Sequence, residues 1–146
     1  MSEKENKAVI QSIFQEILNE GKTDKIDGLI ADDYVYHGPG GYEFKGIEGV
    51  KKFMIWLKNS FPTLNLTIDD LIAEGDKVVT YFTMTGADKR NKQFNVQGVV
   101  KSLVVGGKEV ETWEILDRFE IASQLAPGWA KAILNLIDKQ STKGRP

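Results

Sequence analysis

The stretch that decides the fold is FPTLNLTIDDLIAEGDKVVTYFTMTG, residues 61–86. Apolar residues alternate with polar ones from residue 64 to residue 68, which is the pattern of a half-buried strand. EGDK at 74–77 is a turn sequence, and a second strand-forming run extends from Val78 to Thr85. These residues predict an antiparallel hairpin.

The flanking segments predict an α+β fold. Apolar residues at helical spacing indicate a helix over residues 8–20, which Gly21 ends. Further helices are expected from Thr23 to about residue 30, around 50–57, at 122–125 and over 129–137, and further strands at 34–37, 94–105 and 110–119. Helices first and antiparallel strands second can bury both layers if the sheet curls around the helices. Such a curled sheet often leaves a concave, mostly apolar pocket.

Composition narrows the class of protein. The 146 residues are 41% hydrophobic and 27% charged, as expected for one soluble globular domain. The net charge of −2, with Lys and Arg scattered among acids, disfavours nucleic-acid binding. There is no cysteine, no apolar run long enough for a membrane span and no apolar core of a signal peptide in MSEKENK. We therefore expect a cytoplasmic protein.

Several motifs occur in a recognisable order along the chain. YVYHGPG at 34–40 is followed by FKGIEGVKKFM at 44–54, by the hairpin sequence, and by GGKEVETWEILDRFEIASQLA at 106–126. This order resembles the SnoaL-like polyketide cyclases, within the wider fold group of nuclear transport factor 2 and ketosteroid isomerase. The resemblance implies one cone-shaped α+β barrel domain over residues 1–146. Its core would span about 8–126, with a helical extension at about 127–140.

The same resemblance implies a function. It predicts a polyketide cyclase or related isomerase that performs acid/base chemistry next to a carbonyl on a small apolar or aromatic substrate. No metal or organic cofactor is expected, and the protein would be a homodimer. The aspartate of the E-x-W-x-x-x-D block is the acid/base residue in relatives, and here it is Asp117. The histidine that follows the first strand in relatives corresponds to His37.

The chain departs from the family pattern at some positions. Relatives often carry a Gly-Thr-His turn where this chain has Gly86-Ala87-Asp88, so Asp88 is the nearest positional substitute for the second histidine. A solvated turn is the simpler interpretation of Asp88, because it lies in the polar loop ADKRNKQ. Relatives also commonly carry an arginine ahead of the last hairpin, and this chain has none there.

Both candidate catalytic residues have structural alternatives. Asp117 shares strand parity with Trp113 and Ile115, so it would be poorly solvated if that face lined the cone. Alternatively, it lies at the strand end, paired with Arg118 of a neighbouring subunit or capping the next helix. His37 is the one side chain whose ordinary pKa lies near neutrality, yet a histidine before a Gly-Pro turn is often a rim residue bonded to backbone.

Aromatic residues are the expected substrate-binding groups. Most must belong to the core, and the candidates for the pocket are Tyr36, Phe53, Trp56, Tyr81 and Trp113. A pocket tyrosine would donate a hydrogen bond to a developing enolate oxygen. The apolar stripe on the last helix would either cap the cone or cross to a partner chain. The main alternative function is a non-catalytic ligand-binding or dimerisation module on the same fold. An epoxide hydrolase-like activity ranks below it, because it would need acids with an arginine deep in the pocket, where no arginine of this chain is expected.

Overall fold

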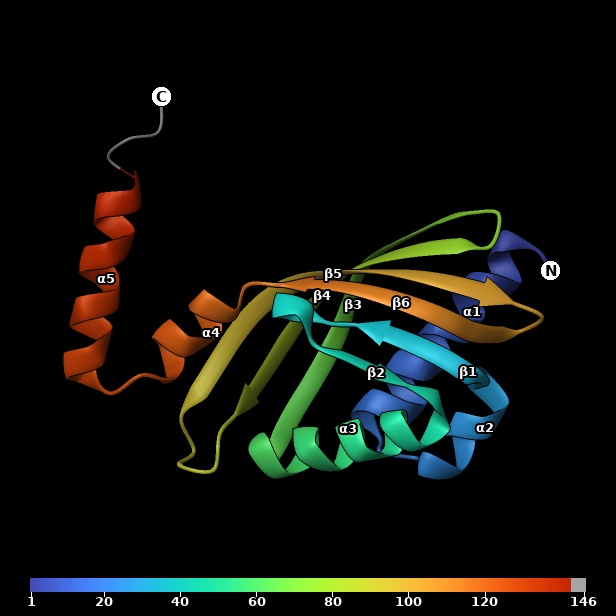
Figure 1. Cartoon of the computed structure of the whole chain (residues 1–146), viewed down its shortest axis with the longest axis horizontal. Coiled ribbons are helices and arrows are strands. Elements are labelled where there is room, and N and C mark those ends of the chain that lie inside the picture. The colour runs from blue at the N-terminus through green and yellow to red at the C-terminus, as the bar shows by residue number, and fades with distance from the viewer. Residues whose placement is uncertain (143–146) are drawn as a thin grey trace.

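The computed structural model describes residues 1–142 and shows a curved sheet with helices along one side (Figure 1). The helical elements are α1 (Glu3–Ser12), η1 (Ile13–Asn19), η2 (Thr23–Lys25), α2 (Ile26–Leu29), η3 (Pro39–Gly41), α3 (Gly46–Ser60), α4 (Arg118–Leu125) and α5 (Gly128–Thr142). The strands are β1 (Ile30–His37), β2 (Glu43–Lys45), β3 (Thr63–Glu74), β4 (Lys77–Ala87), β5 (Gln93–Val105) and β6 (Lys108–Leu116). The α+β fold is as predicted.

The sheet is mixed, with the strand order β2-β1-β6-β5-β4-β3. The predicted hairpin is present as β3 and β4, and its turn places Gly75 at a φ of +58°, which glycine adopts readily. β1 pairs with β6 in parallel, and every other neighbouring pair is antiparallel. The first long strand is therefore hydrogen-bonded to the last.

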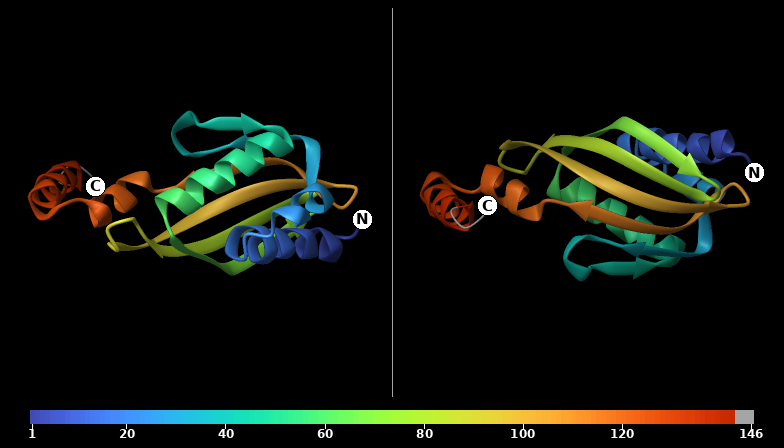
Figure 2. Two further views of the ribbon diagram at one scale, coloured as in Figure 1. Left: turned by 90° about the horizontal axis from the view of Figure 1, so that it is seen from below. Right: turned by 90° about the horizontal axis from the view of Figure 1, so that it is seen from above.

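The N-terminal helix begins at a capping box, in which Ser2 and Glu5 each accept a hydrogen bond from the other's backbone N–H. Helical structure runs on as the π-helical turn η1 and ends before Gly21, as the sequence predicts. Ile10, Phe14 and Ile17 are buried against the sheet, and the ring of Phe14 meets Phe82 edge-on at 5.7 Å. Figure 2 shows α1 and α3 crossing the same face of the sheet.

Two local predictions are incomplete. The strand expected at 110–119 ends at Leu116, because the side chain of Asp117 caps α4 by accepting a hydrogen bond from the Glu120 N–H at 2.9 Å. β2 has no counterpart among the expected strands, because its three residues are too few for an alternating pattern to be visible.

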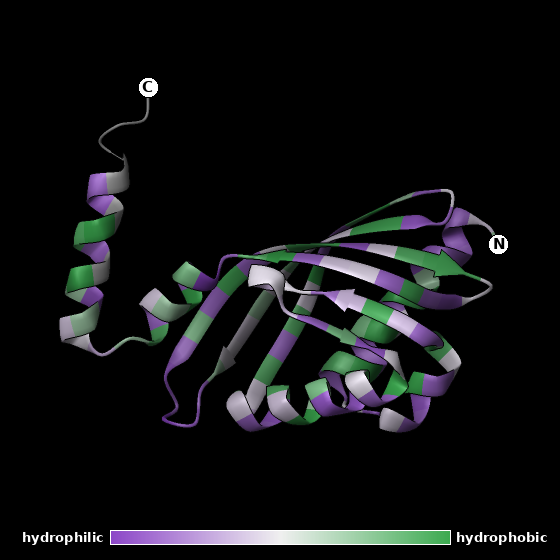
Figure 3. Ribbon diagram, viewed as in Figure 1, coloured by the Kyte–Doolittle hydropathy of each residue, from purple (hydrophilic) through white to green (hydrophobic). Residues whose placement is uncertain are grey.

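The C-terminal helix α5 stands away from the sheet and follows α4 (Figure 1). Its apolar residues Trp129, Ile133, Leu136 and Ile137 are exposed, Trp129 to 73%. Figure 3 shows hydrophobic bands on this helix and the alternation of polar and apolar residues along the strands. In this chain α5 does not cap the cone. None of the helices within residues 1–142 combines the length and the apolar character needed to span a membrane.

Candidate functional site

A cavity of about 740 Å³ lies between the concave face of the sheet and the helices. This volume suits a drug-sized organic ligand. Most of its lining is aliphatic or aromatic, from η1, β1, β2, α3, the inner face of β4 to β6 and the start of α4. Its polar lining residues are Tyr34, Tyr36, Tyr42, Glu109, Thr112, Glu114 and Arg118.

One wall of the cavity is a series of stacked aromatic rings. Tyr36 of β1 stacks on Phe44 of β2 at 4.6 Å between ring centroids, and Phe44 stacks on Phe53 of α3 at 5.1 Å. Trp56 extends the series from Phe53 at 5.8 Å. The pocket positions expected for Tyr36, Phe53 and Trp56 agree with the cavity lining. Flat rings arranged in this way favour a flat ligand.

Strand β6 supplies the acids of the cavity. Thr112, Glu114 and Leu116 lie two residues apart and face the cavity, because side chains alternate along a strand. Trp113 and Ile115, on the opposite parity, do not line it. Trp113 and Ile115 therefore lie on the outer face of the sheet. Asp117 has the same parity but follows the end of the strand.

Glu114 and Tyr36 form the polar centre of the cavity. The Tyr36 hydroxyl donates a hydrogen bond to Glu114 Oε2 across the parallel β1–β6 pair. Burial raises the pKa of Glu114, and the Tyr36 hydroxyl partly offsets that rise. Burial, and then the neighbouring Glu114, raise the pKa of Tyr36. The tyrosine therefore stays protonated while the carboxyl is poised to exchange a proton nearer neutrality than an exposed glutamate.

Glu109 is a second acid of the cavity on the same strand, and it is buried. A register shift between Leu103 and Val104 of β5 lies opposite this part of β6, and Glu109 lines the cavity together with Thr112. Its Oε1 accepts a hydrogen bond from Thr112 Oγ1 at 2.6 Å. Burial raises the pKa of Glu109, and the hydroxyls of Ser102 and Thr112 act in the opposite direction.

Asp117 lies outside the cavity. It is exposed and caps α4, which is one of the structural alternatives left open by the sequence. Arg118, the next residue, lines the cavity and lies against Gly40 of the η3 turn. Of these two neighbours, the arginine rather than the aspartate faces the cavity.

His37 is the last residue of β1 and does not line the cavity. Its two ring nitrogens contact Glu43 Oε2 at 2.9 Å and Glu111 Oε1 at 2.8 Å. The imidazole also stacks on Trp113, with 5.3 Å between the ring centroids. The Glu111 carboxylate, opposed by desolvation and supported by Glu43, raises the pKa of His37. This arrangement holds the ring against the outer face of β6.

Two of the aromatic candidates occupy positions other than those expected. Trp113 lies on the outer face beneath the Lys101 ammonium, 3.8 Å from the ring centroid. Tyr81, also on the outer face, donates a hydrogen bond to Gln97 Oε1 at 2.8 Å. Both belong to the outward-pointing set of their strands, which corrects their expected place in the pocket.

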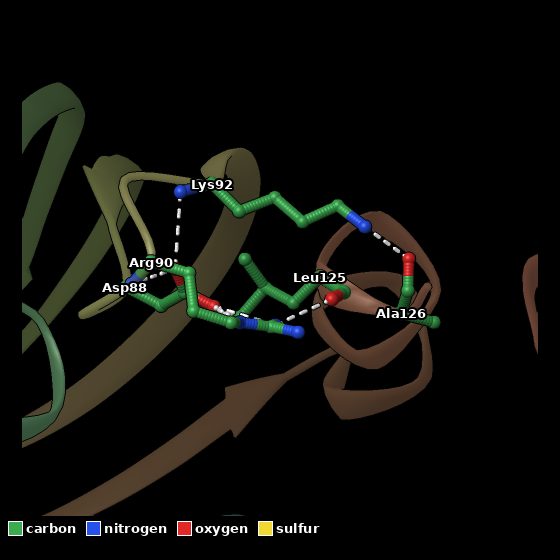
Figure 4. Close-up of polar contacts among 5 residues, drawn as sticks. All are labelled: Asp88, Arg90, Lys92, Leu125 and Ala126. Carbon is green, nitrogen blue, oxygen red and sulfur yellow. Dashed lines mark hydrogen bonds and ion pairs between the residues drawn. The ribbon is translucent and has the colours of Figure 1, made fainter. Parts of the chain in front are cut away.

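Asp88 organises the loop between β4 and β5. Its side chain accepts hydrogen bonds from the Arg90 guanidinium and from the backbone N–H groups of Lys92 and Arg90, and these contacts lower its pKa. Arg90 and Lys92 in turn donate to the carbonyls of Leu125 and Ala126 at the end of α4 (Figure 4). Asp88 does not line the cavity.

Strand parity in the sequence favoured the face of Trp113 and Ile115, and so passed over Glu114. Glu109 has the same parity as Trp113, and it lines the cavity because the register shift between Leu103 and Val104 interrupts the alternation of β6. The signal that could have identified Glu114 is its alternation with Trp113 and Ile115, once the inner face of the strand is known. Among residues 1–142, no group of three or more His, Asp or Glu side chains is arranged to hold a metal ion.

Comparisons with known proteins identify the relatives of this chain. Residues 8–125 match the family described as SnoaL-like polyketide cyclase. A candidate polyketide cyclase from Acidithiobacillus ferrooxidans is 28% identical, with a TM-score of 0.75 over 86% of this chain and 97% of the other. IdmH, a candidate polyketide cyclase from Streptomyces antibioticus, is 26% identical, with a TM-score of 0.74 over 82% and 97%. No match was found among curated proteins.

A third structure supports the fold alone. A candidate SnoaL-like polyketide cyclase from Jannaschia sp. CCS1 has a TM-score of 0.78 at 20% identity, covering 86% of this chain and 95% of the other. The match to this chain extends over 95–97% of each of these three structures. The cone-shaped domain is therefore common to all of them.

Proposed function

Because the chain belongs to the SnoaL-like polyketide cyclase family, we propose that it is a cofactor-independent enzyme that acts next to a carbonyl of a small, flat, apolar substrate. We assign the acid/base role to Glu114 rather than to Asp117 or His37. The observation that carries this assignment is the hydrogen bond from Tyr36 to a half-buried Glu114 that lines the cavity. Asp117 and His37 do not line that cavity.

The proposed reaction needs no co-reactant. The Glu114 carboxylate takes a proton from the carbon next to the substrate carbonyl, and the C–H electron pair becomes part of an enolate. Once Glu114 holds this proton, the single O–H of Tyr36 turns from Glu114 to the enolate oxygen and stabilises it by donating a hydrogen bond. In cyclisation, the enolate carbon bonds to a second carbonyl carbon of the same molecule, whose oxygen takes up the proton. In isomerisation, the proton returns to another carbon.

The test uses 1-tetralone, a flat ketone with exchangeable hydrogens at one carbon next to its carbonyl. We expect the protein to accelerate deuterium uptake at that carbon in D₂O, followed by NMR. Glu114→Gln should lower the enzyme-catalysed rate by roughly 10²- to 10⁴-fold, the usual contribution of a general base. Asp117→Asn should retain it, because Asp117 is exposed at the α4 N-terminus.

The assignment fails if Glu114→Gln exchanges as fast as the wild type, or if Asp117→Asn is the variant that loses the rate. A wild-type protein that binds 1-tetralone without exchanging it would favour the alternative, a non-catalytic binding module. That module would have no need of convergent polar groups in its pocket, and the Tyr36–Glu114 pair weighs against it.

We further propose a homodimer formed through the outer face of the sheet. Strand register places Tyr81, Val99 and Ile115 side by side on β4, β5 and β6. Ile115 is 75% exposed, and Ile72 and Val79 on neighbouring strands are also exposed. An apolar row of this kind on a sheet is typical of a surface that another protein covers. The location of the protein in the cytoplasm stays a prediction.

A further inference from the structure

The cavity contains a second polar cluster that the proposed reaction does not use. Glu109, Thr112 and Tyr34 all line the cavity, further along β6 and β1 from α4 than the Tyr36–Glu114 pair. Glu109 is only 5% exposed, and Thr112 and Tyr34 are also buried. The pKa of Tyr34 is raised, first by burial and then by Glu109, so these two groups share one environment.

The hydrogen-bonding capacity of Glu109 is only partly used within the protein. Its Oε1 accepts a hydrogen bond from Thr112 Oγ1, and the Ser102 hydroxyl is a second polar neighbour that acts to lower its pKa. Burial raises its pKa and so favours the protonated carboxyl, which has one O–H donor in addition to its acceptor oxygens. A buried polar group in apolar surroundings is unfavourable unless it finds partners. A ligand oxygen in the adjoining cavity would supply such a partner.

The spacing of the two clusters follows from the strands. Thr112 and Glu114 are two residues apart on one face of β6, and Tyr34 and Tyr36 are two residues apart on β1. In the parallel register Tyr36 lies beside Thr112, so the two strands present their polar groups together. Two residues along a strand correspond to ~7 Å. Because Thr112 Oγ1 donates a hydrogen bond to Glu109 Oε1 at 2.6 Å, the Glu109 carboxyl lies beside Thr112 rather than five full residues from Glu114. The otherwise apolar wall therefore has polar groups at Thr112 and Glu114 at about the separation of oxygens on neighbouring fused rings.

We propose that Glu109, supported by Thr112 and Tyr34, is a second recognition point that binds a hydroxyl or carbonyl oxygen on the far ring of a flat, fused-ring substrate. This proposal rests on the proposed function in placing the reacting carbonyl at Glu114. It defines the substrate class more closely: a fused-ring ketone with a second oxygen on the ring remote from the ketone.

The test compares two ketones that differ by one hydroxyl. Dissociation constants of 1-tetralone and 6-hydroxy-1-tetralone are measured by isothermal titration calorimetry. For the wild-type protein we expect the hydroxylated ketone to bind roughly tenfold more tightly, the effect of one well-made hydrogen bond. In Glu109→Leu this ratio should fall to about one, because the leucine offers no polar partner. Thr112→Val should reduce the ratio to an intermediate value.

Glu111→Gln is the matched control, since it removes a carboxylate from the outer face of the same strand. It should keep the wild-type ratio. If Glu109→Leu fails to fold, Glu109→Gln replaces it and should lower the ratio, because an amide changes the donors and acceptors offered to the hydroxyl. A wild-type protein without a preference for the hydroxylated ketone overturns the proposal. So does a preference that survives both Glu109 substitutions.

The two proposals can fail separately. Deuterium exchange in the wild-type protein tests the chemistry at Glu114, whereas the ratio of dissociation constants tests recognition at Glu109. A ratio that depends on Glu109 without any exchange would retain the recognition point and remove the enzyme assignment. Exchange that depends on Glu114, with no dependence of the ratio on Glu109, would do the reverse.

Discussion

The two faces of β6 carry the same kinds of residue in opposite physical states. On the inner face, Glu114 is half-buried, accepts a hydrogen bond from one tyrosine hydroxyl and has a raised pKa. On the outer face, Glu111 pairs with His37, and Ile115 is largely exposed. The environment of a carboxylate on β6 therefore depends on the face of the strand from which its side chain projects. The inner face suits proton transfer and ligand binding, and the outer face suits contact with water or a second protein.

The largest expected difference between the faces concerns stability. Phe82 and Tyr81 are neighbours on β4, but Phe82 is fully buried on the inner face and Tyr81 is 40% exposed on the outer face. We expect Phe82→Ala to lower the free energy of unfolding by about 3–5 kcal/mol, because it leaves a cavity in the core. Tyr81→Ala should lower it by about 1 kcal/mol or less. Urea denaturation of both variants, at one protein concentration low enough for the protein to be monomeric, measures the contrast. Equal losses would contradict this description of the faces.

A smaller effect is expected for assembly. Ile115→Glu adds a charge to the apolar row of the outer face, and burying an unpaired charge in an interface is unfavourable. We expect the dissociation constant of the homodimer to increase at least about tenfold, measured by sedimentation equilibrium. Asn59→Glu adds the same charge to the exposed end of α3 and should leave the dimer intact. A wild-type protein that sediments as a monomer at all concentrations would refute the proposed interface.

The smallest effect concerns the single histidine. The pKa of His37 is raised in the folded protein, so its contribution to stability is fully present below the unfolded value of about 6.5. That contribution is lost as the pH rises through the folded pKa. Because the chain has one histidine, its ring resonance titrates without overlap in NMR.

The outer-face acid is expected to control this titration. Glu111→Gln removes the largest cause of the raised pKa and should shift the titration of His37 to lower pH, while Glu43 remains in place. It should also weaken the loss of stability between neutral and alkaline pH. A wild-type His37 that titrates at or below 6.5 would show that these contacts do not favour the imidazolium in solution.

Much of the fold was predictable because its signals are local. The alternation in 61–86, the turn at 74–77 and the helix ended by Gly21 each depend on residues close in sequence, and the structure confirms them. The order of motifs added the family, and with it the cone-shaped domain. The end of β6 was less accessible, because a capping aspartate and a strand-forming phenylalanine two residues later favour opposite structures.

The site was harder to predict, because it depends on which face of β6 meets the helices. Alternation places Glu111, Trp113 and Ile115 together, as expected, but it does not say which of the two faces is buried. The side that receives α1 and α3 is decided by the whole sheet. Tyr36, Phe53 and Trp56 line the cavity and their role in substrate binding stays a prediction, whereas the acids on the inner face became visible only in three dimensions.

The parallel pairing of β1 with β6 has a consequence for how the protein acquires its site. Tyr36 and Glu114 are separated by 78 positions in the chain, so folding of either segment alone cannot bring the two residues together. Contacts of such long range slow folding, because a large loop must close before they form. On the ribosome, the N-terminal helices and the β3–β4 hairpin emerge well before β6. The pocket can therefore close only late in synthesis, and until then β1 and β5 both expose unpaired edges that favour aggregation.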